Sequence, residues 1–362
     1  MKTQVLFFLI ILCCFSCSKD ALVEKDDTTT EVNSIYFPPI NSNDWEASIP
    51  SELGWDLSSE QPLKAYLDEK GTDAFMILKD GKIAVEWYFG DFNMDSNHTW
   101  NSAAKTLVAS VIGIAQEEGH LSLDNASADY LGEGWSSLTL EQENNITVKH
   151  HLTMTTGLDY TVEDDFCTDK ECLIYKNDPG SYWYYHNATY AVLDELITGA
   201  TNQNFKTYFN TNLRDRIGMQ GLWVKVGYLN LYYSTARSMA RFGLLNLNNS
   251  VWGDVTILGD TNYINDMKKT SQDHNKSYGY LWWLNGKESF KLPGTETLYS
   301  GKLIPSAPDD LYAGLGANDQ KLYIVPSQGL VIVRMGANAN DSTLASSTFD
   351  EELWQKINAF IK

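Results

Sequence analysis

The chain has 362 residues, of which 43% are hydrophobic and 20% are charged, and its formal net charge at pH 7 is −20. This length is sufficient for one large domain or two small ones with a sizeable core. So acidic a surface repels phosphate backbones and anionic membranes, which argues against a nucleic-acid-binding protein.

The N-terminus has the features of a targeting segment. Lys2 precedes an apolar run over residues 5–15, which is too short to cross a bilayer as a mature helix. The run ends at Ser16 and Cys17 and resembles a bacterial lipoprotein signal, in which the cysteine becomes the lipid-bearing first residue. Cys14 stands where such signals usually have leucine, so ordinary signal cleavage is the alternative.

Three parts of the chain follow from this interpretation. We expect a lipoprotein-type signal peptide over residues 1–17, a polar tether over 18–45 and a folded domain over 46–362. The mature protein would be exported and either lipid-anchored to the bacterial envelope through Cys17 or secreted. That lipid would be its only attachment to a membrane.

The folded part begins with a helix and a hairpin. Residues 62–70 have helical spacing and end at Gly71, and the strands 75–79 and 82–88 flank an Asp80-Gly81 turn. A helix begins near Ala103, and its apolar positions are interspersed with small residues.

The middle of the chain reads as mostly helical or irregular, and strand patterns return only near the C-terminus. The expected helices are 146–154, begun by a Thr147 cap, 190–197 and 234–247; the expected late strands are 278–284, 311–313, 321–325 and 330–335; a helix over 349–361 closes the chain. Strands at both ends with helices between them predict an α+β fold. Its one antiparallel sheet is formed by both ends of the chain and flanked by helices, with a mainly helical lobe inserted over about 103–290.

Two of the five cysteines, Cys167 and Cys172, lie in the expected folded domain. An oxidising destination favours a small loop disulfide between them, and two reduced thiols are the alternative. A metal site would need further ligands nearby, and none are present. No metal or organic cofactor is implied.

Ser102 and Lys105 form an S-x-x-K pattern at the start of the helix that begins near Ala103. At this spacing the two side chains share one face, and burial would favour the neutral amine, which places a base beside a nucleophile. The plain alternative is that Ser102 caps the helix and Lys105 extends to the surface. Ser16 and Lys19 have the same spacing in a region that cannot be catalytic, so the pattern needs its context.

The context resembles the serine β-lactamase and penicillin-binding protein family. Ser102 and Lys105 are followed by a Y-x-N motif and then by a glycine-containing strand, and G-x-S-x-G and H-E-x-x-H are absent. Three segments resemble its class C and esterase branch, which includes the 6-aminohexanoate-dimer hydrolases: ITVKHHLTMTTGL at 146–158, YSTARSMARFG at 233–243 and YGYLWW at 278–283.

The resemblance implies a β-lactamase/transpeptidase-like fold and assigns a base. Y-x-N occurs five times, but only the copy at Tyr185 and Asn187 follows a Pro179-Gly180 pair, as in the family. Tyr185 would be the general base, kept phenolate-like by Lys105, and Asn187 would hold the substrate carbonyl arm.

The third family motif falls on Gly314-Leu315-Gly316. Gly316 would leave backbone space for the substrate, and Ala317 would lend an N–H to the oxyanion hole. Gly314 stands where the family has a cation that grips a carboxylate, which argues against β-lactam and D-Ala-D-Ala recognition. Three other cations could replace it from elsewhere in the chain: Arg237, Arg241 and Lys302.

We therefore expect a serine hydrolase that forms a covalent acyl-enzyme with a small ester or amide substrate. The alternatives are a β-lactamase or D-Ala-D-Ala carboxypeptidase-type enzyme, and a non-catalytic binding domain on the same fold.

Overall fold

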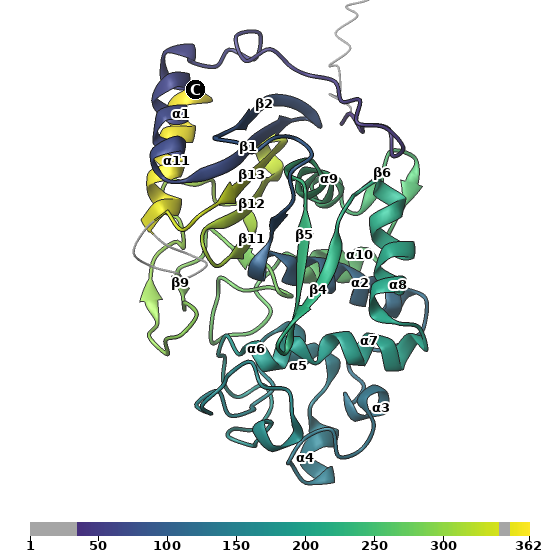
Figure 1. Ribbon diagram of the computed structural model, residues 1–362. Coiled ribbons are helices and arrows are strands. Elements are labelled where there is room, and N and C mark those ends of the chain that lie inside the picture. Colours follow the sequence, from purple (N-terminus) through teal and green to yellow (C-terminus); the bar gives the residue numbers. More distant parts are fainter. Residues whose placement is uncertain (1–34, 340–347) are drawn as a thin grey trace, which may run out of the picture. The chain divides into compact units, whose positions relative to one another are not determined.

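The computed structural model describes residues 35–339 and 348–362 (Figure 1). The predicted signal peptide, its Cys17 and the tether up to residue 34 lie outside these ranges. Residues 35–362 form one compact unit. Its main sheet has six strands, all antiparallel, in the order β2-β1-β13-β12-β11-β8. Their bounds are β1 Thr72–Lys79, β2 Lys82–Tyr88, β8 Trp283–Leu284, β11 Tyr312–Gly316, β12 Gln320–Val325 and β13 Leu330–Gly336.

This sheet confirms the prediction that both ends of the chain build it. The β1–β2 hairpin turns at Asp80 and Gly81, whose φ angles of 49° and 86° are those that an Asp-Gly turn supplies. A Cβ at Gly81 would lie 1.9 Å from the carbonyl oxygen of Tyr36, so glycine is required there. On its other edge β1 pairs with β13, and Phe75 lies opposite Arg334.

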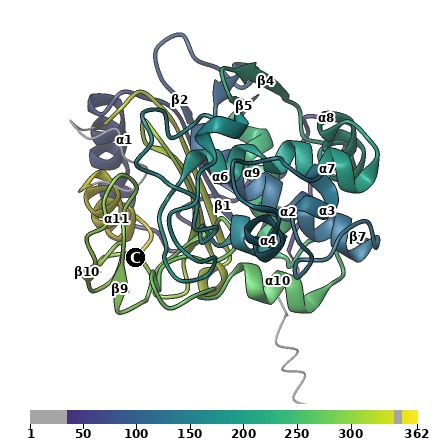
Figure 2. The same cartoon turned by 90° about the horizontal axis from the view of Figure 1, so that it is seen from below.

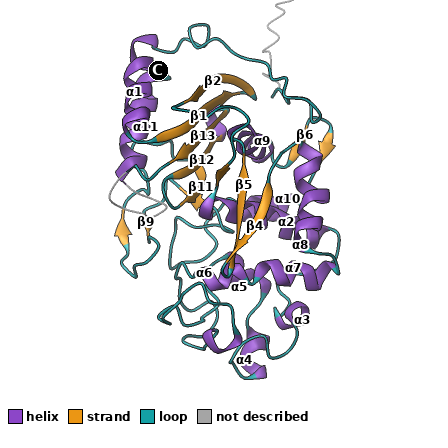
Figure 3. Cartoon of the chain, in the orientation of Figure 1, coloured by secondary structure: helices purple, strands orange, loops and turns teal. Residues whose placement is uncertain are grey.

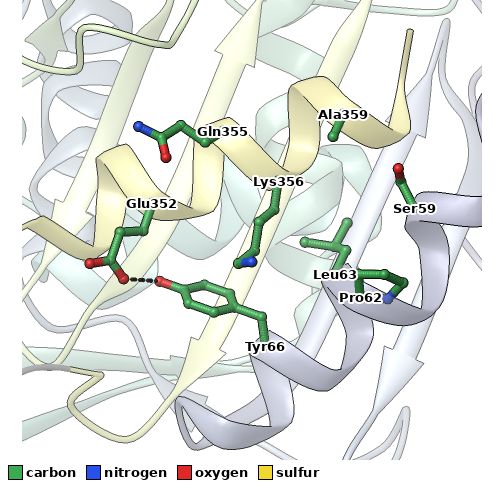
Figure 4. Close-up of a pocket in the computed structure, with 8 residues that line it drawn as sticks. All are labelled: Ser59, Pro62, Leu63, Tyr66, Glu352, Gln355, Lys356 and Ala359. Carbon is green, nitrogen blue, oxygen red and sulfur yellow. Dashed lines mark hydrogen bonds between the residues drawn. The ribbon is translucent and has the colours of Figure 1, made fainter.

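Helices cover both faces of the main sheet (Figures 1 and 2). The helices α1 (Glu60–Glu69) and α11 (Thr348–Phe360) lie together on one face, and α9 (Ala236–Leu247) packs against β12 and β13 on the other. A shallow groove runs between α1 and α11, where the hydroxyl of Tyr66 donates to Glu352 at 2.8 Å (Figure 4). Because α9 packs on the sheet, it is not part of the helical lobe in which we had expected it.

The remaining elements all belong to the segment between β2 and β11 in the sequence, which includes the inserted lobe (Figure 3). These helices are α2 Lys105–Glu117, α3 Ala128–Leu131, α4 Leu140–Asn145, α5 Val148–Leu152, α6 Asn187–Ala191, α7 Leu193–Thr201, α8 Phe205–Phe209 and α10 Thr261–Met267. These strands are β3 His98–Thr99, β4 Leu222–Val226, β5 Leu229–Ser234, β6 Val251–Trp252, β7 Val255–Thr256, β9 Ser289–Phe290 and β10 Tyr299–Ser300. The lobe is therefore less helical than predicted, because β3, β5 and β4 form a three-stranded sheet within it.

Two strand predictions were wrong for physical reasons. The hairpin of β4 and β5 was not predicted, although Val224-Lys225-Val226 and Leu229-Asn230-Leu231 alternate between apolar and polar side chains. Each alternating run has only three residues, fewer than the four to eight that indicate a half-buried strand. Residues 278–284 were predicted as one strand, yet only β8 joins the sheet. Leu281 has a φ of 60°, and Tyr278 bridges back to Trp283, so these aromatic residues form a tight turn in the core.

The folded domain begins before the predicted boundary at residue 46. The amide of Tyr36 donates to the carbonyl of Asp80 at 3.0 Å, and the indole of Trp45 donates to the carbonyl of Gly81 at 2.7 Å. These bonds fasten residues 35–45 to the β1–β2 turn, so this segment is part of the domain rather than of the tether. Among the described helices, none combines the length and the apolar content needed to span a membrane.

Candidate active site

Ser102 lies at the junction between the two lobes, on a 3-10 turn (Asn101–Ala104) that leads directly into α2. The first residue of that turn, Asn101, has a φ of 47°, an unusual conformation for a residue with a side chain. No side chain caps the turn or α2, so the interpretation of Ser102 as a helix cap is wrong. Its hydroxyl instead accepts a hydrogen bond from Lys105 at 3.1 Å.

Lys105 is buried, with 3% of its surface exposed, so it does not extend to solvent. Its Nζ donates to Ser102 Oγ and, at 3.2 Å, to Asn187 Oδ1. Burial lowers the pKa of Lys105 to about 7, and the carboxylate of Asp165 opposes this shift. Near neutral pH, a large fraction of this amine is therefore unprotonated and can accept a proton.

Tyr185 is the second buried group beside the nucleophile. Its ring stacks on Trp283 at a centroid distance of 5.8 Å and meets Tyr278 edge-on. Burial raises the pKa of the Tyr185 phenol well above its usual value, and a hydrogen bond with Ser102 opposes this rise. The direction of this shift is opposite to that required by a phenolate-like tyrosine, so in this structure Tyr185 is a neutral phenol.

Asn187, at the first position of α6, connects two charged groups. Its Oδ1 accepts from Lys105, and its Nδ2 donates to Asp165 Oδ2 at 3.2 Å. Asp165 was not singled out in the sequence, because it lies in an acidic loop without a motif. Burial raises the pKa of this carboxyl group, and the hydrogen bond from Asn187 opposes the rise.

The end of β11 lies directly against the turn that carries Ser102. A Cβ at Gly316 would lie 2.3 Å from the carbonyl oxygen of Trp100, so the close approach requires glycine. Ala317 lines the cavity beside Ser102, and its carbonyl accepts from Asn101 Nδ2 at 2.7 Å. Gly314 instead faces the start of α2, where a Cβ would lie 3.3 Å from the Ala103 carbonyl oxygen, and it does not line the cavity.

These residues surround a cavity of about 450 Å³. Its charged lining residues are Lys105 and Asp165, and its apolar ones include Phe166, Leu229 and Leu231. The full lining is Asn101, Ser102, Lys105, Asp165, Phe166, Tyr185, Asn187, Tyr190, Leu229, Asn230, Leu231, Pro293, Gly294 and Ala317. Ser102, Lys105, Tyr185, Asn187 and Ala317 thus come together from three separate parts of the chain.

The cations that could have replaced the missing one at position 314 are engaged elsewhere. Arg237 donates to both carboxylate oxygens of Glu86, at 2.6 and 2.7 Å. Arg241 donates to backbone carbonyls, including that of Pro39 at 2.8 Å, and Lys302 pairs with Asp309. None of the three lines the cavity.

The loop that carries Asp165 is closed by a disulfide between Cys167 and Cys172. The hydroxyl of Tyr228, in the turn between β4 and β5, donates to Asp169 of this loop at 2.5 Å. The loop and the hairpin, each of which contributes lining residues to the cavity, are therefore joined to one another. Within residues 35–339 and 348–362, no cluster of three or more histidine, cysteine or acidic side chains is arranged to hold a metal ion.

A serine and a buried lysine, one turn apart at a helix start and beside a glycine-bearing strand, define a serine hydrolase of the S-x-x-K type. Residues 63–345 match the Beta-lactamase family model, and the chain belongs to the beta-lactamase family. It is 23% identical over 320 residues to the 6-aminohexanoate-dimer hydrolase of Paenarthrobacter ureafaciens, covering 76% of this chain and 75% of that protein.

Solved structures support the same fold. A candidate 6-aminohexanoate-dimer hydrolase from Bacillus anthracis has a TM-score of 0.68 at 21% identity, over 90% of this chain and 89% of that one. A candidate beta-lactamase from Bacteroides dorei has a TM-score of 0.66 at 16% identity, over 85% and 99%. A penicillin-binding protein from Bacillus halodurans has a TM-score of 0.57 at 17% identity, over 82% and 99%.

Proposed function

We propose that this hydrolase cleaves a small ester or amide through a covalent acyl-enzyme on Ser102. One observation carries the proposal: the Lys105 amine, with a pKa of about 7, lies 3.1 Å from the Ser102 hydroxyl oxygen. A base matched to neutral pH and in hydrogen-bond contact with a nucleophile is the arrangement that activates a serine.

We assign the proton transfers from the protonation states of Lys105 and Tyr185 in the resting enzyme. The neutral Lys105 amine accepts the Ser102 proton as Oγ attacks the carbonyl carbon and forms a tetrahedral intermediate. The protonated Tyr185 phenol donates its proton to the leaving alcohol or amine as the bond to that group breaks, and it regains a proton from the Lys105 ammonium. Water then attacks the acyl-serine, and the same groups return a proton to Ser102.

A neutral substrate fits the cavity better than an anionic one. Apart from Lys105, the described lining has no cation, and the acidic Asp165 lies beside it. One charge-assisted hydrogen bond contributes about 1.5–3 kcal/mol, so its absence corresponds to about a 10- to 150-fold loss for a carboxylate-bearing substrate. The name of the Paenarthrobacter relative supports a small amide as one natural substrate class.

The experiment is active-site labelling followed by kinetics. A fluorophosphonate should label Ser102 in the native protein, and Ser102→Ala should abolish labelling. Ser59→Ala is the matched control because Ser59 lies in the groove between α1 and α11. p-Nitrophenyl butyrate should be hydrolysed far faster than the chromogenic cephalosporin nitrocefin. Comparable rates would favour the β-lactamase alternative, and an unlabelled, inactive native protein would favour a binding domain.

We also propose that the protein is exported and anchored by a lipid on Cys17. The support is the apolar run ending at Cys17 and the disulfide between Cys167 and Cys172, a bond that persists in oxidising compartments. Mass spectrometry of the mature protein should find a lipid-modified Cys17 as the first residue, and Cys17→Ala should release the protein from membranes. An unmodified N-terminus beyond Cys17 would contradict the anchor.

A further inference from the structure

The hairpin of β4 and β5 has two unlike faces. On one face lie the cross-strand pairs Trp223 with Tyr232 and Lys225 with Asn230, and there Trp223 and Tyr232 are buried against Phe209 of α8 at centroid distances of 5.4 and 5.3 Å. The other face carries three cross-strand apolar pairs, which we call the apolar strip: Leu222 with Tyr233, Val224 with Leu231, and Val226 with Leu229.

The outer half of the apolar strip lies in solvent. Leu222, Val224 and Val226 are 53%, 37% and 52% exposed, and they lie on the edge strand of their sheet (Figures 1 and 2). A solvated strand face normally carries polar side chains, and an exposed edge of this kind favours association with other chains. Contiguous exposed apolar side chains therefore indicate a binding surface rather than ordinary surface composition.

The inner half of the apolar strip belongs to the catalytic cavity. Leu229 and Leu231 line that cavity together with Ser102, while their cross-strand partners Val226 and Val224 are exposed on β4. The same apolar surface thus runs without interruption from the cavity that holds the nucleophile out to the edge of the sheet. Phe166, which is 38% exposed, is a further apolar side chain of the cavity lining.

We propose that the apolar strip binds an aliphatic chain of the substrate, so that the enzyme prefers esters or amides with a medium-length or long alkyl chain. The proposal rests on the proposed function, because the chain is held while Ser102 attacks the carbonyl at one end of it. Over the five residues from Leu222 to Val226 the strip extends about 13 Å, which is four steps at the rise of a β-strand. An uncharged alkyl chain loses no favourable interaction there, because the strip consists of apolar side chains.

Chain-length kinetics test the proposal. In the native protein, kcat/KM should rise by about two- to fourfold per added CH2 from acetate to octanoate, the range expected for partial to full burial of each methylene. One arm uses p-nitrophenyl alkanoates, in which the chain is in the acyl group. The other uses alkyl acetates, in which the chain is in the leaving group, and the arm that rises identifies the side bound. All substrates are kept below the concentrations at which they form micelles.

Variants connect the effect to the apolar strip. Val224→Asp should lower the octanoate-to-acetate ratio of kcat/KM by about tenfold or more, since it places a charge at the centre of the strip. Val224→Thr keeps the shape of the side chain and should lower the ratio by a smaller factor, which keeps the test valid if the aspartate variant does not fold. Val255→Asp is the matched control, because Val255 is a 48% exposed strand valine outside the strip, and it should leave the ratio as in the native protein.

The possible failures are distinguishable. If kcat/KM does not change with chain length in either arm, while acetate esters are still hydrolysed through Ser102, the apolar strip does not bind the alkyl chain. The proposed function would then still stand. An absence of hydrolysis and of Ser102 labelling would overturn the proposed function itself. If the native protein sediments as a dimer and Val224→Asp as a monomer with the native ratio, the strip is a contact between two copies and the proposal is wrong.

Discussion

The side-chain amide of Asn101 donates to the backbone carbonyl of Ala317 at 2.7 Å. This bond ties the residue before the nucleophile to the residue that follows Gly316 on the facing strand end. The backbone of Asn101 is in the left-handed conformation, with a φ of 47°, while its side chain makes this bond. The spacing between the nucleophile turn and the end of β11 therefore depends on one short side chain.

Removing this bond should weaken both stability and catalysis. Asn101→Ala loses a hydrogen bond and places alanine at a positive φ, so we expect the free energy of unfolding to fall by about 1–3 kcal/mol and kcat by about tenfold. Asn101→Gly tolerates the φ but also lacks the amide, so it should recover stability more than kcat. If the glycine variant has native kcat, the bond does not position the site.

The three groups around the nucleophile should behave as one catalytic unit. Ser102→Ala, Lys105→Ala and Tyr185→Phe should each lower kcat for p-nitrophenyl butyrate by about 10³-fold or more, and double variants should add little to this loss. Circular dichroism and thermal unfolding check that the fold is intact. A Tyr185→Phe variant with near-native kcat would remove the phenol from the proton transfers.

The pH dependence of activity should follow the Lys105 amine. Because the amine must be neutral to accept the Ser102 proton, kcat/KM for a neutral ester should be low in acid, rise through a pH of about 7 and level off above it. The Tyr185 phenol should not contribute to the profile over this pH range, because burial raises its pKa. A rate that is flat from pH 5 to 9 would contradict Lys105 as the base.

The free energy of unfolding should also depend on pH through Lys105. Because burial lowers the pKa of this amine, the protein should become more stable as the pH rises. The folded pKa of Lys105 is about 7 against an unfolded value of 10.5, so the unfolded chain binds more protons between these limits. The resulting destabilisation is fully present below pH 7 and is relieved as pH rises. Relative to Lys105→Met, the native protein should gain about 2–3 kcal/mol of unfolding free energy between pH 7 and 9. Denaturant unfolding of both proteins measures the difference.

The charge of Asp165 should affect the pKa of Lys105 and therefore the pH at which activity rises. Its carboxylate holds the pKa of Lys105 higher than burial alone would. Asp165→Asn should therefore move the midpoint of the pH–rate profile to lower pH. Glu163→Gln removes an acid from the same loop that does not line the cavity, and its profile should keep the native midpoint. An unmoved midpoint in Asp165→Asn would mean that the charge does not reach Lys105.

The two glycines of β11 offer a paired test of close packing. At Gly316 a methyl group would meet the backbone of Trp100 at 2.3 Å, whereas at Gly314 its nearest neighbours lie at 3.3 Å. Gly316→Ala should abolish measurable esterase activity or prevent folding, and Gly314→Ala should retain activity to within about tenfold, since small overpacking is absorbed by local shifts. Similar behaviour of both variants would mean that the strand end is not fixed against the nucleophile turn.

What the sequence could predict depended on local signals. The Asp80-Gly81 turn, the apolar runs that flank it and the one-turn spacing of Ser102 and Lys105 are all patterns of neighbouring residues. The structure has the turn, the two strands and the paired side chains. The order of the family motifs then placed Tyr185 and Asn187 near Ser102, and their convergence followed from that order.

The features that could not be predicted from the sequence depend on tertiary contacts. Asp165 lines the cavity from a loop that is closed by a disulfide and bonded to the turn between β4 and β5, and no spacing in the sequence signals this. The protonation state of Tyr185 follows from its burial beneath Trp283, which motif order does not reveal. The hairpin that carries the apolar strip was not predicted because its alternating runs, Val224-Lys225-Val226 and Leu229-Asn230-Leu231, are only three residues long.

The pairing of Phe75 with Arg334 has a consequence for the timing of folding. Until β13 has left the ribosome, the β1–β2 hairpin has one unpaired edge and no sheet to join. Such distant pairing slows folding and exposes strand edges meanwhile. The catalytic lobe, which is inserted between these strands, must then wait for the end of synthesis before its site can close. A chain whose sheet is completed last stays unfolded longest, and an unfolded chain is what the export proposed above would require.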